Sequence, residues 1–385
     1  MKPTGIEYVR IQGFRSLKDV ELSGLPRVAV LIGANGSGKS NFIRFFEMLS
    51  WMLGPRRLAE FVASRGGADD QLHGGNRRTP RIEAEVRLRT DEGRNDYRFM
   101  LSRAQPDHFI FSEEAFRFDD PNDLHPTTNW YYLGSGHLEA KIVEAAQPPS
   151  PSAHYSLDWP EANPLVAERI VNRLRKCSVY QFHDTSDESN FKKRWDAEDN
   201  NYLLSHGGNL AAVLLRLKQE DIKRYELICQ HISRILPVFD RFQTEESYGK
   251  VLLRWKAKWT DKTFSAHLTS DGSLRFFALV TLLNLPPEML PDVLLLDEPE
   301  LGLHPAAISL IGGMIKSLAE KRQVIVATQS PLLVDAFDLD EIFVLELQDG
   351  RTEFRKLSPD DYQVWLDDNF TSGELWQKNL LGGRP

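Results

Sequence analysis

The residues from Gly33 to Ser40 could bind the phosphates of a nucleotide. They read G-A-N-G-S-G-K-S and fit the phosphate-loop (P-loop) pattern G-x-x-x-x-G-K-[ST] without a mismatch. Glycines let backbone amides close around a phosphate, while Lys39 would reach the β- and γ-phosphates and Ser40 would bind Mg²⁺. The residues assigned to the nucleotide by this pattern are Gly33, Ala34, Asn35, Gly36, Ser37, Gly38, Lys39 and Ser40.

Two carboxylates far along the chain could complete this chemistry. Asp297 and Glu298 follow the apolar run 293–296, which predicts a buried strand with both acids at its carboxyl end. Nucleotide hydrolysis needs a metal-side carboxylate and a group that orients the attacking water. We therefore expect Asp297 to hold Mg²⁺ together with Ser40, and Glu298 to polarise the water.

Two more polar turns have open interpretations. Residues 268–275 form a hydroxyl- and glycine-bearing turn that opens onto a helix, either as a second anion-binding helix N-terminus or as an ordinary N-cap by Ser270 or Ser273. Residues 327–331 end the strand that follows Asp297, and a polar side chain there would sense the γ-phosphate or simply form a turn.

The elements around these residues predict an α/β fold. The apolar run 28–32 leads into the P-loop as a strand, and residues 41–52 follow it as a helix. Alternating helices and strands between 273 and 347 favour a parallel sheet that is covered on both faces. Further predicted segments are strands at 6–12, 20–22 and 178–182, an antiparallel meander at 81–89, 97–103, 108–111 and 115–118, a mobile loop at 64–78, an irregular insertion at 119–163, a helix at 210–236 and a strand at 246–258.

The sequence divides into three predicted parts. Residues 1–118 form a β-rich first lobe with the P-loop, and residues 119–240 form an irregular and helical insertion that includes the end of the first lobe. Residues 241–385 form a second lobe that carries Ser270, Asp297 and the polar turn at 327–331. The predicted fold class is therefore an α/β P-loop NTPase with a mixed sheet.

Composition narrows the class of protein. The 385 residues are 41% hydrophobic and 26% charged, with a net charge of -8, which argues against a generally basic nucleic-acid coat. Only two cysteines occur, so a disulfide framework is excluded. The N-terminus lacks the pattern of a signal peptide, and no apolar run approaches the roughly 20 residues of a membrane span. These features predict a soluble, cytoplasmic protein without a membrane partner.

Several motifs in this order resemble the ABC-type ATPase head of the RecF, SMC and Rad50 proteins. The form N-G-x-G-K-S-N at 35–41 is typical of that group, and D-E-P-E-L-G-L-H-P at 297–305 is similar to small OLD-like ATPases of prokaryotes. The stretches 13–17, 373–376 and 382–385 are also similar to members of this group. We expect no Toprim domain, because only about forty residues follow Leu347, and no long coiled-coil arms.

This resemblance implies roles for individual residues. Ser270, Gly272 and Ser273 match the signature motif, which binds the γ-phosphate of an ATP held by the opposite subunit of a head-to-tail homodimer. Gln329 matches the switch position, and His183, or Gln181 nearby, falls near the metal-coordinating loop. Arg15 and Asn41 are assigned to the nucleotide, and the implied catalytic set is Glu298, Gln329 and Lys39 with ATP and Mg²⁺.

The resulting hypothesis is an ATPase that dimerises around ATP and acts in DNA repair or anti-phage defence with a separately encoded effector. The alternative is a nucleotide-sensing regulatory subunit with little turnover, because Gln329 cannot titrate where many relatives have histidine. A transporter subunit, a small-molecule kinase and a GTPase fit the motifs less well. DNA is a candidate partner, because local basic clusters could form a groove for it; the alternative is that they are only solvated faces. The clusters are Arg56-Arg57, Arg77-Arg78, Arg173 with Arg175-Lys176, and Lys192-Lys193-Arg194.

Overall fold

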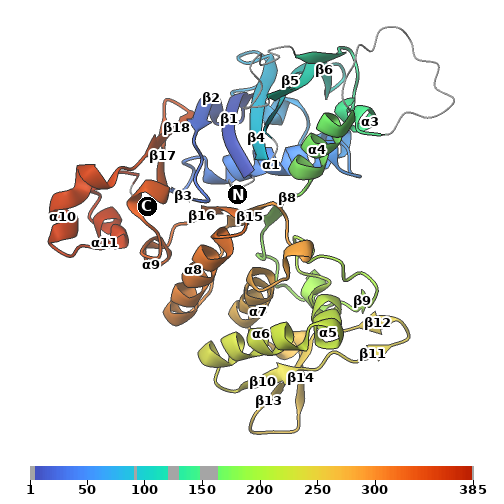
Figure 1. The fold of residues 1–385 in the computed structure, drawn as a ribbon, viewed down its shortest axis with the longest axis vertical. Coiled ribbons are helices and arrows are strands. Elements are labelled where there is room, and N and C mark those ends of the chain that lie inside the picture. Colours follow the sequence, from blue (N-terminus) through green and yellow to red (C-terminus); the bar gives the residue numbers. More distant parts are fainter. Residues whose placement is uncertain (1–4, 91–92, 120–129, 148–163, 384–385) are drawn as a thin grey trace.

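A six-stranded mixed sheet lies at the centre of the protein (Figure 1). The computed structural model describes residues 5–90, 93–119, 130–147 and 164–383. Neighbouring strands are parallel except in the β17–β18 hairpin, so the predicted parallel pairing is confirmed. In spatial order the strands are β18 (Arg351–Lys356), β17 (Ile342–Gln348), β3 (Val28–Ile32), β16 (Gln323–Ala327), β15 (Val293–Asp297) and β8 (Cys177–Tyr180).

The two faces of this sheet belong to separate hydrophobic cores. Leu31 and Leu295 point into one core, which is covered by α1 (Lys39–Leu53) and α4 (Pro164–Arg175). Val30 and Leu296 point into the other core, which is covered by α7 (Asp271–Leu283) and α8 (Pro305–Ala319). Because both faces are buried, the central strands are apolar at nearly every position, which is the pattern that made them predictable. The sheet takes strands from all three predicted parts of the chain.

The first lobe is built on a second, antiparallel six-stranded sheet. The predicted meander is confirmed, but the two strands expected at 108–111 and 115–118 are one strand with a register shift opposite Met100 and Leu101. In spatial order the strands are β2 (Leu17–Ser23), β1 (Gly5–Phe14), β4 (Arg81–Thr90), β5 (Gly93–Ala104), β6 (His108–Asp119) and β7 (Tyr131–Gly134).

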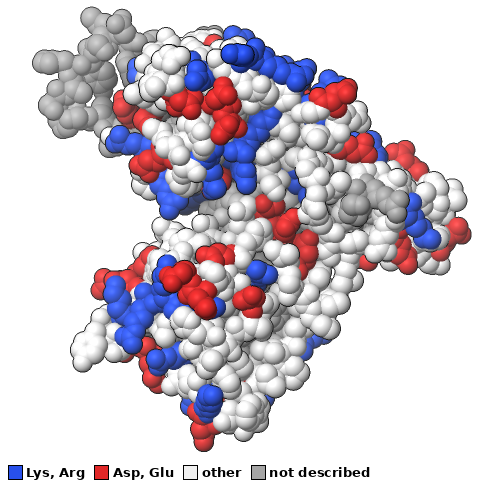
Figure 2. All heavy atoms as spheres, turned by 180° about the vertical axis from the view of Figure 1, so that it is seen from behind, with Lys and Arg blue, Asp and Glu red and all other residues white. Residues whose placement is uncertain are grey.

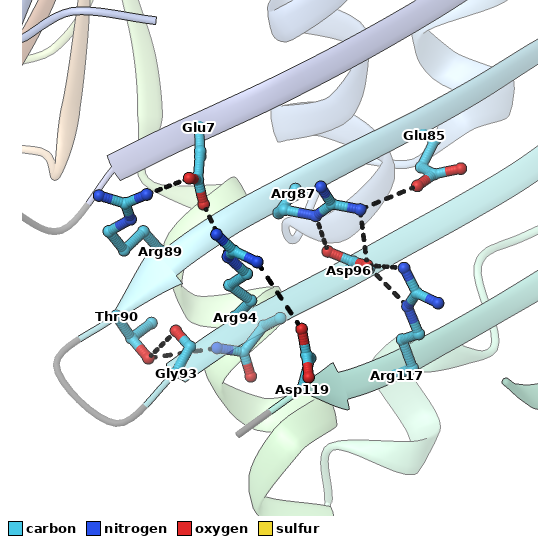
Figure 3. A network of polar contacts seen from close by, with 11 residues as sticks. Glu7, Glu85, Arg87, Arg89, Thr90, Gly93, Arg94, Asp96, Arg117 and Asp119 are labelled. Carbon is cyan, nitrogen blue, oxygen red and sulfur yellow. Dashed lines mark hydrogen bonds and ion pairs between the residues drawn. The ribbon is translucent and has the colours of Figure 1, made fainter. Parts of the chain in front are cut away.

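A polar network joins neighbouring strands on the surface of this antiparallel sheet (Figure 3). The Asp96 carboxylate on β5 is buried, and it accepts hydrogen bonds from Arg87 on β4 at 2.8 Å and pairs with Arg117 on β6 at 2.6 Å. The guanidinium groups of Arg87 and Arg117 can each make two hydrogen bonds, and these bonds offset the free-energy cost of removing the Asp96 carboxylate from water. The network therefore fixes β4, β5 and β6 relative to one another.

The segment 64–78 differs from the predicted mobile loop. It follows α2 (Leu58–Ser64) and contains a 3-10 turn, Asp69–Gln71, whose last residue is buried. The Gln71 amide donates to the carbonyl oxygens of Arg65 at 2.8 Å and Gly67 at 3.1 Å. A buried side chain with satisfied polar groups holds this segment in place. Of the predicted irregular insertion, β7 and α3 (Ile142–Ala145) are described, whereas 120–129 and 148–163 lie outside the described residues.

Helices and small sheets make up the chain between β8 and α7, on both sides of the predicted boundary at residue 240. The helix expected at 210–236 is two helices, α5 (Leu210–Glu220) and α6 (Ile222–Ile235), because Asp221 ends the first and caps the second through the Arg224 amide. The strand expected at 246–258 is divided into short pieces. The small strands are β9 (Trp195–Asp196), β10 (Phe239–Phe242), β11 (Glu246–Ser247), β12 (Lys250–Val251), β13 (Arg254–Ala257) and β14 (Thr263–Ser265).

The last described segment packs back onto the central sheet. It comprises α9 (Pro331–Val334), the β17–β18 hairpin, α10 (Gln363–Asp367) and α11 (Ser372–Gln377). Trp376 is fully buried and donates to the Gly383 carbonyl oxygen at 3.1 Å. Both cysteines, Cys177 and Cys229, are buried free thiols. Among the described residues no helix has the length and apolar character to cross a membrane.

Candidate functional site

The P-loop follows β3 and leads directly into α1, as its sequence predicts. Gly33, Gly36 and Gly38 all have positive φ, in the region that side chains with a Cβ atom avoid. A Cβ atom at Gly33 would also overlap the Leu345 carbonyl oxygen, and one at Gly38 would overlap the Thr352 hydroxyl. The glycines at these two positions are therefore required by the neighbouring hairpin as well as by the shape of the loop.

Lys39 is only 5% exposed and lies across the inside of the loop. Its ammonium donates to the carbonyl oxygens of Gly33 at 2.6 Å and Ala34 at 3.0 Å. Burial lowers the pKa of Lys39, and the carboxylates that follow β15 act in the opposite direction. A cation held inside the loop can move its hydrogen bonds to phosphate oxygens without entering from solvent.

Asp297 stands at the carboxyl end of β15, next to the first turn of α1. Its Oδ1 accepts a hydrogen bond from the Ser40 hydroxyl at 3.4 Å, so the two predicted metal ligands lie together. Burial, followed by the neighbouring Glu298 charge, raises the pKa of Asp297. Hydroxyl and carboxylate oxygens are the ligands that Mg²⁺ prefers, and a bound cation would offset the cost of a charged, buried Asp297. Ser40 and Asp297 therefore fit a magnesium ion.

Gln181 and His183 contact different groups of Asp297. The Gln181 side chain donates to Asp297 Oδ2 at 2.7 Å. His183 is exposed, and its Nε2 lies 3.3 Å from the Asp297 backbone carbonyl oxygen. Of the two residues that the sequence left open, Gln181 is the one whose side chain contacts the metal-side carboxylate. A metal role for His183 stays a prediction.

Glu298 and Gln329 meet beside Asp297. Glu298 has a φ of 49°, which turns the chain sharply after β15, and its side chain accepts a hydrogen bond from the Gln329 amide. Glu300 lies behind this pair and accepts from the Gln329 backbone amide at 2.8 Å. Burial is the main cause that raises the pKa of Glu300. The structure thus brings the predicted water-orienting acid and the predicted switch residue into direct contact.

The signature-like turn makes no contact with the P-loop among the described residues. Ser270 caps α7 by accepting from the Ser273 amide at 3.3 Å, as the N-cap interpretation requires. Gly272 packs against the Gly302 carbonyl oxygen, where a Cβ atom would overlap it. Arg275 ties this helix to the loop after β8, donating to the carbonyl oxygens of Phe182 and His183. The exposed Ser270 is thus held at the surface by its own lobe.

Arg15 and Asn41 make hydrogen bonds to residues outside the P-loop. Arg15, which has a φ of 50°, donates to the Gln71 amide oxygen at 2.9 and 3.0 Å, and burial lowers its pKa. Asn41 donates to the Ser16 hydroxyl at 2.8 Å, and this hydroxyl is hydrogen-bonded to Thr352 at 2.7 Å. Direct contact of Arg15 or Asn41 with a nucleotide stays a prediction.

Sequence reasoning missed three residues that shape the site. Glu300 could have been found as a further carboxylate in D-E-P-E, whereas Thr352 lies on β18, which was not predicted. Arg275 carries no local signal, because its partners are backbone carbonyl groups, and those of Phe182 and His183 are more than 90 residues away. Of the predicted P-loop residues, Asn35 and Gly36 are exposed, and Ser37 is buried.

Comparison with known proteins finds relatives of this chain by sequence and others by fold. A family model described as "AAA domain, putative AbiEii toxin, Type IV TA system" matches residues 28–335. The DNA replication and repair protein RecF of Anaeromyxobacter dehalogenans (strain 2CP-C) is 40% identical over 122 residues, which are 30% of this chain and 32% of that protein. RecF of Anaeromyxobacter sp. (strain Fw109-5) is 43% identical over 68 residues, 17% of this chain and 18% of that protein. The chain spans about a third or less of these relatives.

Two solved SMC heads share the fold over most of this chain. An SMC head bound to the C-winged helix domain of ScpA has a TM-score of 0.58 and 17% identity, over 93% of this chain and 99% of that chain. An SMC head with an extended coiled coil, bound to the C-terminal domain of ScpA derived from Pyrococcus furiosus, has a TM-score of 0.56 and 14% identity, over 95% of this chain and 99% of that chain. The predicted fold, a P-loop NTPase of the RecF/SMC-like ABC-head type, is confirmed.

Proposed function

The chain belongs to the family described as "AAA domain, putative AbiEii toxin, Type IV TA system", and from this premise we propose that it is a Mg²⁺-dependent ATPase that dimerises head-to-tail around ATP. One observation carries this proposal. At a single edge of the central sheet, the buried Lys39, the Ser40–Asp297 pair and the Glu298–Gln329 pair meet around the P-loop. These are the parts that phosphoryl transfer to water requires.

The P-loop and its helix would hold the triphosphate of ATP. Backbone amides of the loop and the N-terminus of α1 face the phosphates and favour their negative charge. The Lys39 ammonium would exchange the carbonyl oxygens of Gly33 and Ala34 for β- and γ-phosphate oxygens. Ser40 and Asp297 would hold Mg²⁺, which neutralises charge that develops on the phosphates. Gln181 keeps the Asp297 carboxylate oriented through its hydrogen bond.

Glu298 and Gln329 would act on the attacking water. Glu298 accepts the water proton while the water oxygen forms a bond to the γ-phosphorus and the bond to the β–γ bridging oxygen breaks, releasing ADP and phosphate. The Gln329 amide, already hydrogen-bonded to Glu298, can orient the water or donate to the γ-phosphate. Neither task needs a group that titrates near neutrality.

The second half of the site would come from another copy of the chain. Ser270, Gly272 and Ser273 would contact the γ-phosphate of ATP held by the opposite subunit, as the family resemblance implies. The exposed, capped start of α7 supports this arrangement, because it presents polar groups outward and not toward its own P-loop. Closure would depend on the γ-phosphate, so hydrolysis would reopen the dimer.

Steady-state ATP turnover tests the enzymatic part of this proposal. We expect wild-type protein to release phosphate from ATP only with Mg²⁺, and Lys39→Ala to reduce the rate to background. Lys18→Ala, at an exposed position on β2, is a matched control that should keep the wild-type rate. A rate that survives in Lys39→Ala would contradict the assignment of this site.

A regulatory subunit with little turnover is the second candidate. The observation that favours it is the hydrogen bond between Gln329 and Glu298, which occupies the proposed general base with an amide. In this case ATP binding would gate a separately encoded effector, and hydrolysis would be negligible. Tight Mg-ATP binding without measurable turnover would support this candidate, and a rate clearly above background that Lys39→Ala abolishes would exclude it.

The wider role that we propose is DNA repair or anti-phage defence in the cytoplasm with a partner effector. The name of the matching family and that of the RecF relatives support it. On the face in Figure 2, basic and acidic side chains are interspersed over both the upper and the lower part of the molecule. If basic clusters form a DNA groove, duplex affinity should fall steeply with salt. Binding that is absent, or that salt does not change, would remove DNA as a partner.

A further inference from the structure

We propose that Glu300 is a positioning residue that holds Gln329 against Glu298 for ATP hydrolysis. This inference rests on the proposed ATPase function and assigns a task to a residue outside the predicted catalytic set. Glu300 lies in the turn after β15, two residues beyond Glu298, and it faces the residues that follow the neighbouring strand β16.

One carboxylate oxygen of Glu300 fixes two consecutive residues. Its Oε1 accepts from the Thr328 hydroxyl at 2.7 Å and from the Gln329 backbone amide at 2.8 Å. The side chain of that same Gln329 donates to Glu298. Glu300 thus holds the backbone of Gln329, while Glu298 receives the amide at the end of its side chain.

The strand pairing fixes the two turns relative to each other. β15 and β16 are parallel, with Asp297 opposite Ala327, and the Glu298 amide donates to the Ala327 carbonyl oxygen at 2.8 Å. The two chains leave the sheet side by side from this pair. Beyond this pair, the Thr328 amide still donates to the Leu31 carbonyl oxygen of β3 at 3.0 Å, and Glu300 adds a side-chain link between the two turns.

Thr328 links Glu300 to the next helix, α9, through further hydrogen bonds. The fully buried Thr328 accepts from the Ser330 amide at 3.0 Å through the hydroxyl that donates to Glu300. Ser330 in turn caps α9 by accepting from the Leu333 amide at 3.2 Å. The whole segment from β16 to α9 is therefore held by hydrogen bonds that begin at Glu300.

A carboxylate at this position is costly without a task that needs it. The Oε2 atom of Glu300 is buried without a hydrogen-bond partner among the described residues. A neutral acceptor would satisfy Thr328 and the Gln329 amide at a smaller desolvation cost. An ionised carboxylate makes shorter and stronger hydrogen bonds, which is the property needed to hold a catalytic amide in one orientation.

A double-mutant cycle on kcat tests this assignment. We expect Glu300→Ala to lower kcat about 10- to 100-fold, the usual cost of losing a supporting residue, with little change in the KM for ATP. Because Glu300 acts through Gln329, Glu300→Ala should cause no further loss of kcat in a Gln329→Ala background. Glu300→Gln keeps an acceptor oxygen but loses the charge, so it should restore only part of the activity that Glu300→Ala loses. Glu226→Ala, on the exposed face of α6, is the matched control and should keep the wild-type kcat.

Different outcomes separate this inference from the proposed function. If the fold-losses in kcat of Glu300→Ala and Gln329→Ala multiply in the double variant, Glu300 does not act through Gln329. That result would overturn the positioning role and indicate an independent structural effect. Wild-type turnover with an unchanged kcat in Glu300→Ala would overturn this inference alone, whereas absent wild-type turnover would overturn both. If Glu300→Ala does not fold, Thr328→Val removes one donor at nearly constant volume. It should lower kcat severalfold, again without effect in the Gln329→Ala background, and an additive loss would contradict the proposal.

Discussion

Asp297 is suited to binding a metal ion, and its buried carboxylate is expected to lower the folding stability of the protein when no metal ion is bound. Its carboxylate is 5% exposed, and burial together with the Glu298 charge raises its pKa above the ordinary value of 3.8. A raised pKa means that the folded state keeps a proton at a pH where the unfolded chain has released it. The contribution of Asp297 to stability is therefore greatest at low pH and is lost as the pH rises through the folded pKa.

We predict that Asp297→Asn stabilises the ligand-free protein at neutral pH. Asparagine can accept from Gln181 and donate to Ser40 without carrying a buried charge. The melting temperature should rise by about 2 °C, which corresponds to roughly 1 kcal/mol for a chain larger than a small domain. The gain should shrink as the pH is lowered toward the ordinary pKa of aspartate. Thermal unfolding from pH 4 to pH 8 measures it.

Asp261→Asn, in an exposed loop, is the control for this measurement. It should leave the melting temperature unchanged across the same pH range. A variant Asp297→Asn that is less stable than wild type at pH 8 would contradict the electrostatic explanation. Loss of the stabilisation that Mg-ATP gives to wild type is expected in this variant, because the metal-side carboxylate is gone.

At the same scale, sequence reasoning identified the candidate site residues that lie within motifs. Gly33 to Ser40, Asp297 and Glu298 have fixed neighbours in the chain, so type and spacing are enough to find them. The sequence left Gln181 open beside His183 and assigned no role to Glu300, because the hydrogen bonds of these two residues cross between strand ends that only the folded sheet brings together. Such contacts leave no periodic pattern in a single sequence.

At the scale of elements, the β17–β18 hairpin forms a wall of the P-loop. The Leu345 carbonyl oxygen on β17 lies where a side chain at Gly33 would begin, and Thr352 on β18 lies against Gly38. Thr352 also lies 2.9 Å from the Ser37 carbonyl oxygen and is hydrogen-bonded to Ser16 in the β1–β2 turn. The hairpin therefore fixes the loop to both sheets before any nucleotide binds.

We predict that the wall makes Gly33→Ala more destabilising than Gly36→Ala. Both glycines have positive φ, which costs an alanine about 1–2 kcal/mol. A Cβ atom at Gly36 meets no atom within 4 Å, whereas one at Gly33 overlaps a backbone carbonyl group and adds about 1–3 kcal/mol of overpacking. Equilibrium unfolding in guanidinium chloride compares the two variants. Equal losses would show that the β17 strand does not confine the loop.

The sequence predicted the elements well where burial sets a simple period. The central strands are apolar on both faces and the meander alternates, so both were found. The break between α5 and α6 was missed because apolar spacing continues across Asp221. The break is set by a capping hydrogen bond, which the Asp221 side chain accepts from the Arg224 amide. β18 was missed because only Thr352 among its residues is buried. β18 therefore has no apolar run that would reveal it.

At the scale of the whole molecule, the proposed dimer requires two separate surfaces of the same chain. The P-loop, Asp297 and Glu298 lie at the edge of the central sheet, whereas Ser270 caps a helix with no described contact to that P-loop. Arg275 joins the start of α7 to the backbone of the loop that carries Gln181 and His183. A contact made at Ser270 by a second copy could therefore shift the loop beside Asp297 in the same chain.

We predict that Glu298→Gln forms a stable dimer with Mg-ATP. The substitution removes the proposed proton acceptor but keeps the size of the side chain and an oxygen that can accept from Gln329, so ATP should bind and persist. Light scattering after size exclusion should show a dimer with Mg-ATP and a lower mass with Mg-ADP, since only ATP carries the γ-phosphate that joins the two halves.

Ser270→Arg in the same background introduces bulk and charge at the facing surface and should return the protein to the lower mass while ATP binding remains. A Glu298→Gln protein whose mass is the same with ATP and with ADP would contradict head-to-tail closure, and a dimer that survives Ser270→Arg would place the interface elsewhere on the molecule.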